Sequence, residues 1–183
     1  MDNLMLPIEP LIGEHRLIEK MIALMSMRWK RFKQENKADV NFIAIALDFM
    51  RTYADKCHHG KEEDILFRDL DRKLLSSEHK KILQELRDEH NQARKTVIRL
   101  AEARDKYAAG SQETFMEILN LTKELTELYP KHIEKEDKHF FVPVMQYFNA
   151  EEQQKMLEEF WEADRILVHL IYGNVVEGLQ SQS

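Results

Sequence analysis

Apolar residues recur along this chain at alternating intervals of three and four positions. In the first stretch the series consists of Leu4, Ile8, Leu11, His15, Ile18, Ile22, Met25 and Trp29. Such spacing places the apolar residues in one stripe along an α-helix and is typical of helices that pack in a bundle. The same spacing returns in later segments and predicts helices near residues 8–34, 39–71, 77–108, 112–147 and 151–177.

Turn-forming residues separate the predicted helices. The breaks have the sequences QENKAD, KLLSSE, AAGSQE and YFNAEE. A serine of the pair 76–77 can cap the third helix, and Gly110 is a natural stop at its end. Pro130 lies within the fourth helix and is expected to kink it rather than end it, because the helical spacing continues on both sides. The pattern predicts an all-α fold, an up-down-up-down four-helix bundle over about residues 8–147 with an additional C-terminal helix at about 151–177.

The composition agrees with a helical protein and excludes several classes. Only five Gly and four Pro occur among 183 residues, a length that suits one domain over residues 1–183. The net charge is −6, and no basic tract with interleaved aromatic residues indicates nucleic-acid binding. No apolar run reaches about 18 residues, the first residues do not resemble a signal peptide, and one cysteine cannot form an internal disulfide. We therefore expect a cytoplasmic protein with neither nucleic-acid nor membrane partners.

Each of the four bundle stripes contains a histidine where an apolar residue is expected. These residues are His15, His58, His90 and His132. In an up-down bundle, residues on neighbouring helices lie level when the turn is midway between them in the chain. The midpoints of the three successive pairs fall at positions 36–37, 74 and 111, each within a predicted turn. We therefore expect the four side chains to meet at one depth in the bundle, to within about one turn or ~5 Å.

Two glutamates accompany these histidines. Within the segment CHHGKEEDILF, His58 continues the apolar stripe and Glu62 lies one turn further along the same face. The segment HIEKED repeats this relationship 74 positions later with His132 and Glu136. The repeat indicates a duplicated helical hairpin, and therefore a pseudo-twofold site of four histidines and two glutamates.

His59 and Glu63 directly follow His58 and Glu62 in the chain, and we do not place them among the six predicted ligands. His59 falls on a row with Asp48, Thr52 and Asp55, which we interpret as solvent-exposed or as the edge of the bundle. We predict that His59 and Glu63 are solvated or support the ligands, although either could complete the ligand set.

The proposed donor set indicates a particular class of metal centre. Six convergent donors exceed what one tetrahedral zinc ion requires and suit two metal ions. Mixed imidazole and carboxylate ligation favours iron or manganese, whereas soft-metal sites would use thiolates. We predict two iron ions in a non-haem di-iron centre, with both glutamates and an oxo or hydroxo group as bridges and a position left for an exogenous ligand. A lone core histidine more often simply bonds a carboxylate, but four of them with two HxxxE motifs favour metal binding.

Three segments carry a resemblance to a known family. CHHGKEEDILF, LRDEHNQAR and HIEKEDKHFFVP resemble the hemerythrin-like (HHE cation-binding) proteins, and the resemblance covers essentially the whole chain. It implies a four-helix bundle around a non-haem di-iron centre that binds oxygen or takes part in nitric-oxide, peroxide or iron responses. The ligands that it implies are His15, His58, Glu62, His90, His132 and Glu136.

The chain departs from the oxygen-carrying members at one point. Those proteins have a second histidine four residues from that of the third helix, where this chain has Leu86 and Arg94. The coordination is therefore expected to be more open or to be filled by another group, which argues against simple reversible oxygen carriage.

The function predicted from these observations is that of a di-iron protein. Reduced iron would bind O2, NO or peroxide at an open position, for sensing, storage or detoxification. Alternatives are a di-iron peroxidase or NO-reducing enzyme, an iron donor for iron–sulfur repair, and a metal-free helical interaction module. Whether the protein is an enzyme is left open.

Two further features lie outside the six predicted ligands: the C-terminal helix and the single cysteine. The helix is amphipathic, and two roles are open for it: to cover the bundle or to mediate a homodimer. His169 is expected at that interface rather than at the metal. Cys57 is expected to be a buried free thiol, with redox sensing as a lesser alternative.

Overall fold

The computed structural model describes residues 6–164 and 168–181, and every regular element in these ranges is helical, which confirms the predicted all-α fold. The elements are α1 (Ile8–Glu35), α2 (Val40–Phe49), η1 (Met50–His59), η2 (Glu62–Phe67), α3 (Arg68–Leu70), α4 (Ser77–Ala108), η3 (Gln112–Thr114), α5 (Phe115–Lys135), η4 (Glu136–Phe140), α6 (Phe141–Val144), η5 (Met145–Tyr147), α7 (Ala150–Ala163) and α8 (Val168–Gln180).

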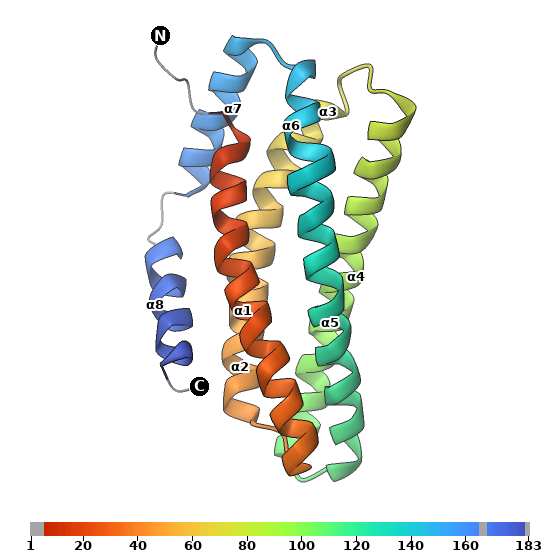
Figure 1. The fold of residues 1–183 in the computed structure, drawn as a ribbon, viewed down its shortest axis with the longest axis vertical. Coiled ribbons are helices and arrows are strands. Elements are labelled where there is room, and N and C mark those ends of the chain that lie inside the picture. The colour runs from red at the N-terminus through yellow and green to blue at the C-terminus, as the bar shows by residue number, and fades with distance from the viewer. Residues whose placement is uncertain (1–5, 165–167, 182–183) are drawn as a thin grey trace.

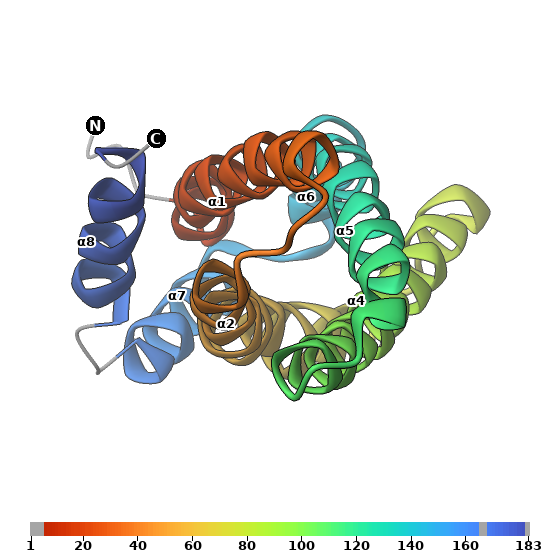
Figure 2. The same ribbon diagram turned by 90° about the horizontal axis from the view of Figure 1, so that it is seen from below.

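Four long helical segments run up and down around one axis. They are α1, the continuous run from α2 to α3, α4, and the run from α5 to η5 (Figure 1). Seen along the axis, the four segments surround a common centre, and α8 lies outside them beside α1 (Figure 2). α5 continues through Pro130, as predicted.

Local interactions explain where the helices start and end. Asp39 accepts hydrogen bonds from the backbone of Asn41 and Phe42 at the start of α2, and Ser76 accepts one from His79 at the start of α4. Gly110 has a φ of 105°, a backbone conformation that favours glycine, and it lies in the turn after α4.

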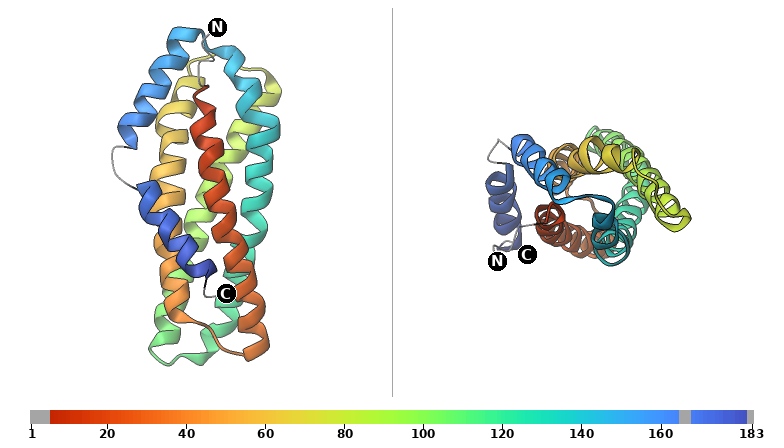
Figure 3. Two further views of the ribbon diagram at one scale, coloured as in Figure 1. Left: turned by 60° about the vertical axis from the view of Figure 1, so that its left-hand side comes forward. Right: turned by 90° about the horizontal axis from the view of Figure 1, so that it is seen from above.

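The predicted C-terminal helical segment is present, but two helices rather than one occupy residues 151–177. α7 ends at Ala163, and α8 begins at Val168; residues 165–167 of the predicted helix lie outside the described residues. Asp164, at the end of α7, accepts hydrogen bonds from the buried ammonium of Lys61. This interaction joins the end of α7 to the second helix of the bundle. α8 packs against α1 and η1 (Figure 3). The structure thus has α8 in the covering role, and a homodimer stays a prediction.

The second and fourth bundle helices contain π-helical turns. These turns form η1, η2 and η4, which carry His58, Glu62 and Glu136 respectively. A π-turn holds an extra residue compared with an α-turn, so it rotates the following side chains relative to the α-helical pattern; such turns are rare and frequent at functional sites.

The hydrophobic core consists of two clusters on either side of the six predicted donors. One cluster fills the end of the bundle near the first and third turns and includes Phe32, Leu47, Leu100 and Leu125. The other fills the opposite end and includes Leu11, Phe67, Leu86 and Phe141. The polar side chains therefore lie between two layers of close-packed apolar residues. Among the described residues, no helix combines the length and the apolar character needed to cross a membrane.

Candidate metal centre

The six side chains that the sequence singles out lie together in one buried group. They are His15 from α1, His58 from η1, Glu62 from η2, His90 from α4, His132 from α5 and Glu136 from η4. All six are at most 2% exposed. The ring centroids are 4.6 Å apart for His15 and His58, and 4.9 Å apart for His90 and His132. The fold thus brings the side chains together, whereas metal binding by them stays a prediction.

A carboxylate lies beside the Nδ1 atom of each of the four histidines. The pairs are His15 with Asp137 at 2.7 Å, His58 with Glu14 at 2.8 Å, His90 with Glu63 at 2.7 Å and His132 with Glu89 at 2.9 Å. Because an ionised carboxylate can only accept, Nδ1 carries a proton in each ring, and Nε2 is the nitrogen left to face the centre of the cluster. Such carboxylate–histidine pairs are the usual means of orienting metal ligands.

Each of these carboxylates also binds a basic side chain. Arg16 bonds Asp137, Lys61 bonds Glu14, Arg94 bonds Glu63 and Lys135 bonds Glu89. Each carboxylate thus lies between an imidazole and a cation. Burial raises the pKa of Glu63, but hydrogen bonds from His90 and Arg94 outweigh it and lower that pKa to about 2.

Glu14, Glu89 and Asp137 were not predicted as partners of the ligands, although the duplication contains a signal for them. Glu14 precedes His15 just as Glu89 precedes the equivalent histidine, and Glu63 follows Glu62 as Asp137 follows the equivalent glutamate. The pseudo-twofold relationship therefore extends from the predicted ligands to the acidic residues that orient them.

The atoms that face the centre of the cluster lack hydrogen-bond partners. They are Nε2 of His15 and His58 and both carboxylate oxygens of Glu62 and Glu136, none of which bonds another described residue. Nε2 of His90 and Nε2 of His132 lie 3.2 Å apart, so two lone pairs face each other. Two nitrogen ligands at adjacent positions on one metal, each bonded at 2.0–2.1 Å, are roughly 3 Å apart. Because buried polar atoms are seldom left unpaired, this donor set fits metal ions in its centre.

The donors fall into two groups that share Glu62. One group is His15, His58, Glu62 and Glu136, and the other is His59, Glu62, His90 and His132; within each group the ligand atoms lie within 4.8 Å of one another. Glu136 lies near both groups, since its Oε2 is 3.2 Å from Nε2 of His15 and 3.3 Å from Nε2 of His132. Both glutamates are therefore placed between the two groups, as bridging ligands would be.

The electrostatics of the cluster also suit a cation. Burial and the nearby carboxylate of Glu136 raise the pKa of Glu62 well above its ordinary value of 4.5. Burial lowers the pKa of His58 well below 6.5, which leaves this imidazole neutral and able to act as a ligand. Burial also lowers the pKa of His15, but the nearby carboxylates of Asp137 and Glu136 outweigh it and raise that pKa to about 9. A metal ion would offset the buried negative charge and displace the proton of His15.

The interpretation of His59 as solvent-exposed is wrong. Its side chain is 1% exposed, and its ring stacks on His90 with centroids 3.8 Å apart. His59 lies at the end of the π-helical segment η1, where the wider turns bring His58 and His59 into the interior together. The prediction that His59 lies on one row with Asp48, Thr52 and Asp55 assumed a regular α-helix, and η1 is not one. Glu63 is confirmed as a supporting group for His90 rather than a solvated residue.

The departure from the oxygen carriers has a structural counterpart. Leu86 is buried in the apolar cluster beside the site, and Arg94 bonds Asp55 at 2.8 Å and Glu63 at 2.9 Å. Neither side chain supplies a ligand atom. Tyr129 is buried beside the ring of His59, with centroids 6.2 Å apart.

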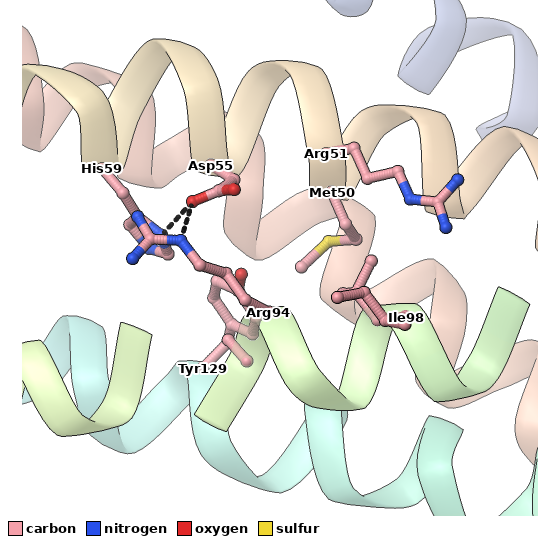
Figure 4. Close-up of a pocket in the computed structure, with 9 residues that line it drawn as sticks. Met50, Arg51, Asp55, His59, Arg94, Ile98 and Tyr129 are labelled. Carbon is pink, nitrogen blue, oxygen red and sulfur yellow. Dashed lines mark hydrogen bonds and ion pairs between the residues drawn. The ribbon is translucent and has the colours of Figure 1, made fainter. Parts of the chain in front are cut away.

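A surface pocket of about 190 Å³ reaches His59 from outside the bundle. Its apolar lining includes Met50 and Ile98, and on its polar side Arg94 bonds Asp55 close to His59 (Figure 4). The pocket gives small molecules a path to the edge of the buried donor group.

A second group of potential ligand atoms lies where the C-terminal segment meets the bundle. It consists of Glu14, Cys57, Asp164 and His169. The ammonium of Lys61 bonds both Glu14 and Asp164 there, so a cation already occupies the group. His169 also lies 3.0 Å from the hydroxyl of Tyr53 across the contact between α8 and η1, in agreement with its predicted place at an interface.

Comparison with known proteins adds a family assignment. The model of the hemerythrin HHE cation-binding domain matches residues 6–144, which contain α1 to α6 and all the histidines and glutamates of the central cluster. Searches of curated proteins and of solved structures found no significant match. α7 and α8 lie beyond the matched span. The chain belongs to the hemerythrin HHE cation-binding domain family, whose members are helical proteins that bind metal cations.

Proposed function

We propose that this protein holds two iron ions with His15, His58, Glu62, His90, His132 and Glu136. Reduced iron then binds O2, NO or peroxide at an open position, for sensing, storage or detoxification. The observation that carries the proposal is the set of buried inward-facing nitrogen and oxygen atoms without hydrogen-bond partners. In a metal-free interaction module these atoms would cost stability and serve no purpose.

The residues around the iron have separable roles in this proposal. The two glutamates lie between the donor groups, where they would help to hold both metals and balance their charge. The carboxylates on Nδ1 hold each imidazole in the ligating tautomer. The two apolar clusters limit access of water. Iron supplies a reversible change of oxidation state and a coordination position for a small ligand.

The experiment that tests the proposal is elemental analysis of freshly purified protein, with iron, zinc and manganese counted together. About two irons per chain are expected. The variants His58→Ala, His132→Ala and Glu136→Ala should each lower the iron content. His79→Ala is a matched control, because His79 is a histidine of the same helical stripe as His90 but bonds the hydroxyl of Tyr147.

Two outcomes would contradict the proposal. One is protein that contains no metal and takes up no iron on anaerobic reconstitution; unchanged thermal stability after chelation would then favour the interaction module. The other is iron content that is the same in all three variants as in the unaltered protein. If two irons are present, anaerobic reduction followed by titration with O2, NO and peroxide distinguishes a persistent adduct from catalytic consumption.

A further inference from the structure

His59 is a buried imidazole that the six-ligand set leaves without a role. Its side chain is 1% exposed, and neither ring nitrogen has a hydrogen-bond partner among the described residues. Nδ1 lies 3.5 Å from a carboxylate oxygen of Asp55, too far for a well-formed hydrogen bond. That oxygen already accepts a hydrogen bond of 2.8 Å from Nε of Arg94. A buried imidazole in this state is unfavourable unless one of its nitrogens binds something else.

The surroundings of His59 indicate what that ligand is. A ring nitrogen of His59 lies within 4.8 Å of ligand atoms of Glu62, His90 and His132. Nδ1 of His59 lies toward Asp55, so Nε2 is the nitrogen left for a metal, although no hydrogen bond orients this ring as it does the other four histidines.

The pseudo-twofold symmetry of the chain breaks at this residue. The position equivalent to His59 in the second half, 74 residues later, is Ile133. Ile133 belongs to the apolar cluster. The two spatial donor groups are therefore unequal: one contains the imidazoles of His15 and His58, and the other contains those of His59, His90 and His132.

We infer that His59 is a seventh ligand of the centre, bound to the same metal as His90 and His132. The inference rests on the proposed function and adds to it. The metal held by His59, His90 and His132 is the more completely coordinated, and the metal held by His15 and His58 keeps more room for an exogenous ligand. His59 thereby fills the place for which Arg94 and Leu86 offer no ligand atom.

The test uses anaerobic titration with Co(II), followed by its visible absorption, on the unaltered protein and on His59→Phe. Phenylalanine keeps a ring that can stack on His90 but has no nitrogen. One of the two cobalt sites should weaken by more than the roughly 10–100-fold that is typical of losing a residue that only orients a ligand. Tyr129→Phe is the control, because Tyr129 borders the same pocket and its ring lies beside His59, with centroids 6.2 Å apart.

A rescue experiment separates ligation from packing. In His59→Ala, free imidazole that enters through the pocket should restore tight binding at the weakened site. It should have no effect on His59→Phe, whose ring fills the space. Restored binding with imidazole but not with toluene, which has a similar flat shape without a nitrogen, supports ligation.

A measurement on the unaltered protein does not depend on how the variants fold. Diferrous protein enriched in ⁵⁷Fe should give two Mössbauer quadrupole doublets of equal area, because three imidazoles bind one iron and two bind the other. A single doublet, or two unaltered cobalt sites in His59→Phe, would overturn the role of His59 and leave the six-ligand centre standing. Failure of the unaltered protein to bind either metal would overturn the proposed function itself.

Discussion

Nδ1 of His132 on α5 lies 2.9 Å from a carboxylate oxygen of Glu89 on the neighbouring helix α4. The pair crosses between two helices and fixes the orientation of the imidazole relative to the centre of the bundle. Its equivalent, His58 with Glu14, crosses between η1 and α1. Through interhelical pairs of this kind, the packing of the helices sets the orientation of the imidazole rings in the candidate site.

Replacing Glu89 should weaken metal binding without removing a ligand. In Glu89→Gln the amide still fills the space, but it no longer enforces a proton on Nδ1 of His132. Metal affinity should fall by roughly 10–100-fold, as is typical for partners that orient ligands. Competition titration with a coloured chelator measures the change. Glu85→Gln is the control, since Glu85 bonds Lys135 but none of the four histidines; equal losses in both variants would contradict the role of Glu89.

Replacing Glu62 should stabilise the metal-free protein while abolishing tight metal binding. Glu62 is fully buried, and the pKa of its carboxyl group is raised by burial and by Glu136. A raised folded-state pKa means that the carboxyl contributes stability fully below pH 4.5 and that this contribution is lost as the pH rises toward the folded-state pKa. In Glu62→Gln, position 62 has no ionisable group, so this pH-dependent contribution to stability is absent.

The difference in unfolding free energy between Glu62→Gln and the unaltered protein therefore depends on pH. In the presence of a chelator, the unfolding free energy of Glu62→Gln should exceed that of the unaltered protein by about 1.4 kcal/mol more for each pH unit above 4.5, up to the folded-state pKa. Urea unfolding at pH 4.5, 5.5 and 6.5 measures this. A difference that stays constant over the three pH values would show that Glu62 is not a buried, uncompensated acid.

Two equivalent lysines should differ sharply in their contribution to stability. Lys61 is 1% exposed and bonds Glu14 and Asp164, whereas Lys135, 74 positions later, is 24% exposed in its side chain and bonds Glu85 and Glu89. Lys61→Ala leaves carboxylates without their buried partner and should cost about 3–5 kcal/mol. Lys135→Ala should cost less than about 1 kcal/mol. Urea unfolding of both variants tests the contrast, and similar losses would mean that the C-terminal segment does not enclose Lys61 in solution.

Cys57 should react slowly with alkylating reagents. Burial raises the pKa of its thiol to about 12, so very little thiolate is present near neutral pH. At pH 8, alkylation by iodoacetamide should be at least about 100-fold slower than that of an unperturbed thiol with a pKa of 8.5. The rate should rise about tenfold per pH unit up to pH 11, since only the thiolate reacts. Fast labelling that levels off near pH 9 would instead support the redox-sensing alternative, and urea-unfolded protein gives the reference rate.

Much of the fold could be predicted because the periodicity of apolar residues is local information. The stripe that contains Ile18, Ile22 and Met25 specifies a helix and its buried face without reference to the rest of the chain. The breaker segments then set the lengths, and the duplication at 74 positions relates His58 to His132. These features together suffice to place four histidines at one level of a bundle.

The C-terminal segment could not be predicted in the same way. Its amphipathic pattern continues past Asp164, so the sequence alone favours one helix over 151–177. The chain instead ends α7 at Ala163, where Asp164 meets the buried ammonium of Lys61. That contact joins residues 103 positions apart, and no local pattern contains it.

The sequence by itself determined the long helices of the bundle and which six histidine and glutamate side chains meet at its centre, because these follow from spacing along one helix and from repetition along the chain. Only the tertiary structure decided which carboxylate orients each imidazole, where α8 lies, and that His59 points inward. Those outcomes depend on interhelical contacts and on π-helical turns, whose extra residue changes the face of every side chain that follows. A periodicity of 3.6 residues cannot reveal such turns, because it assumes the α-helical geometry that they interrupt.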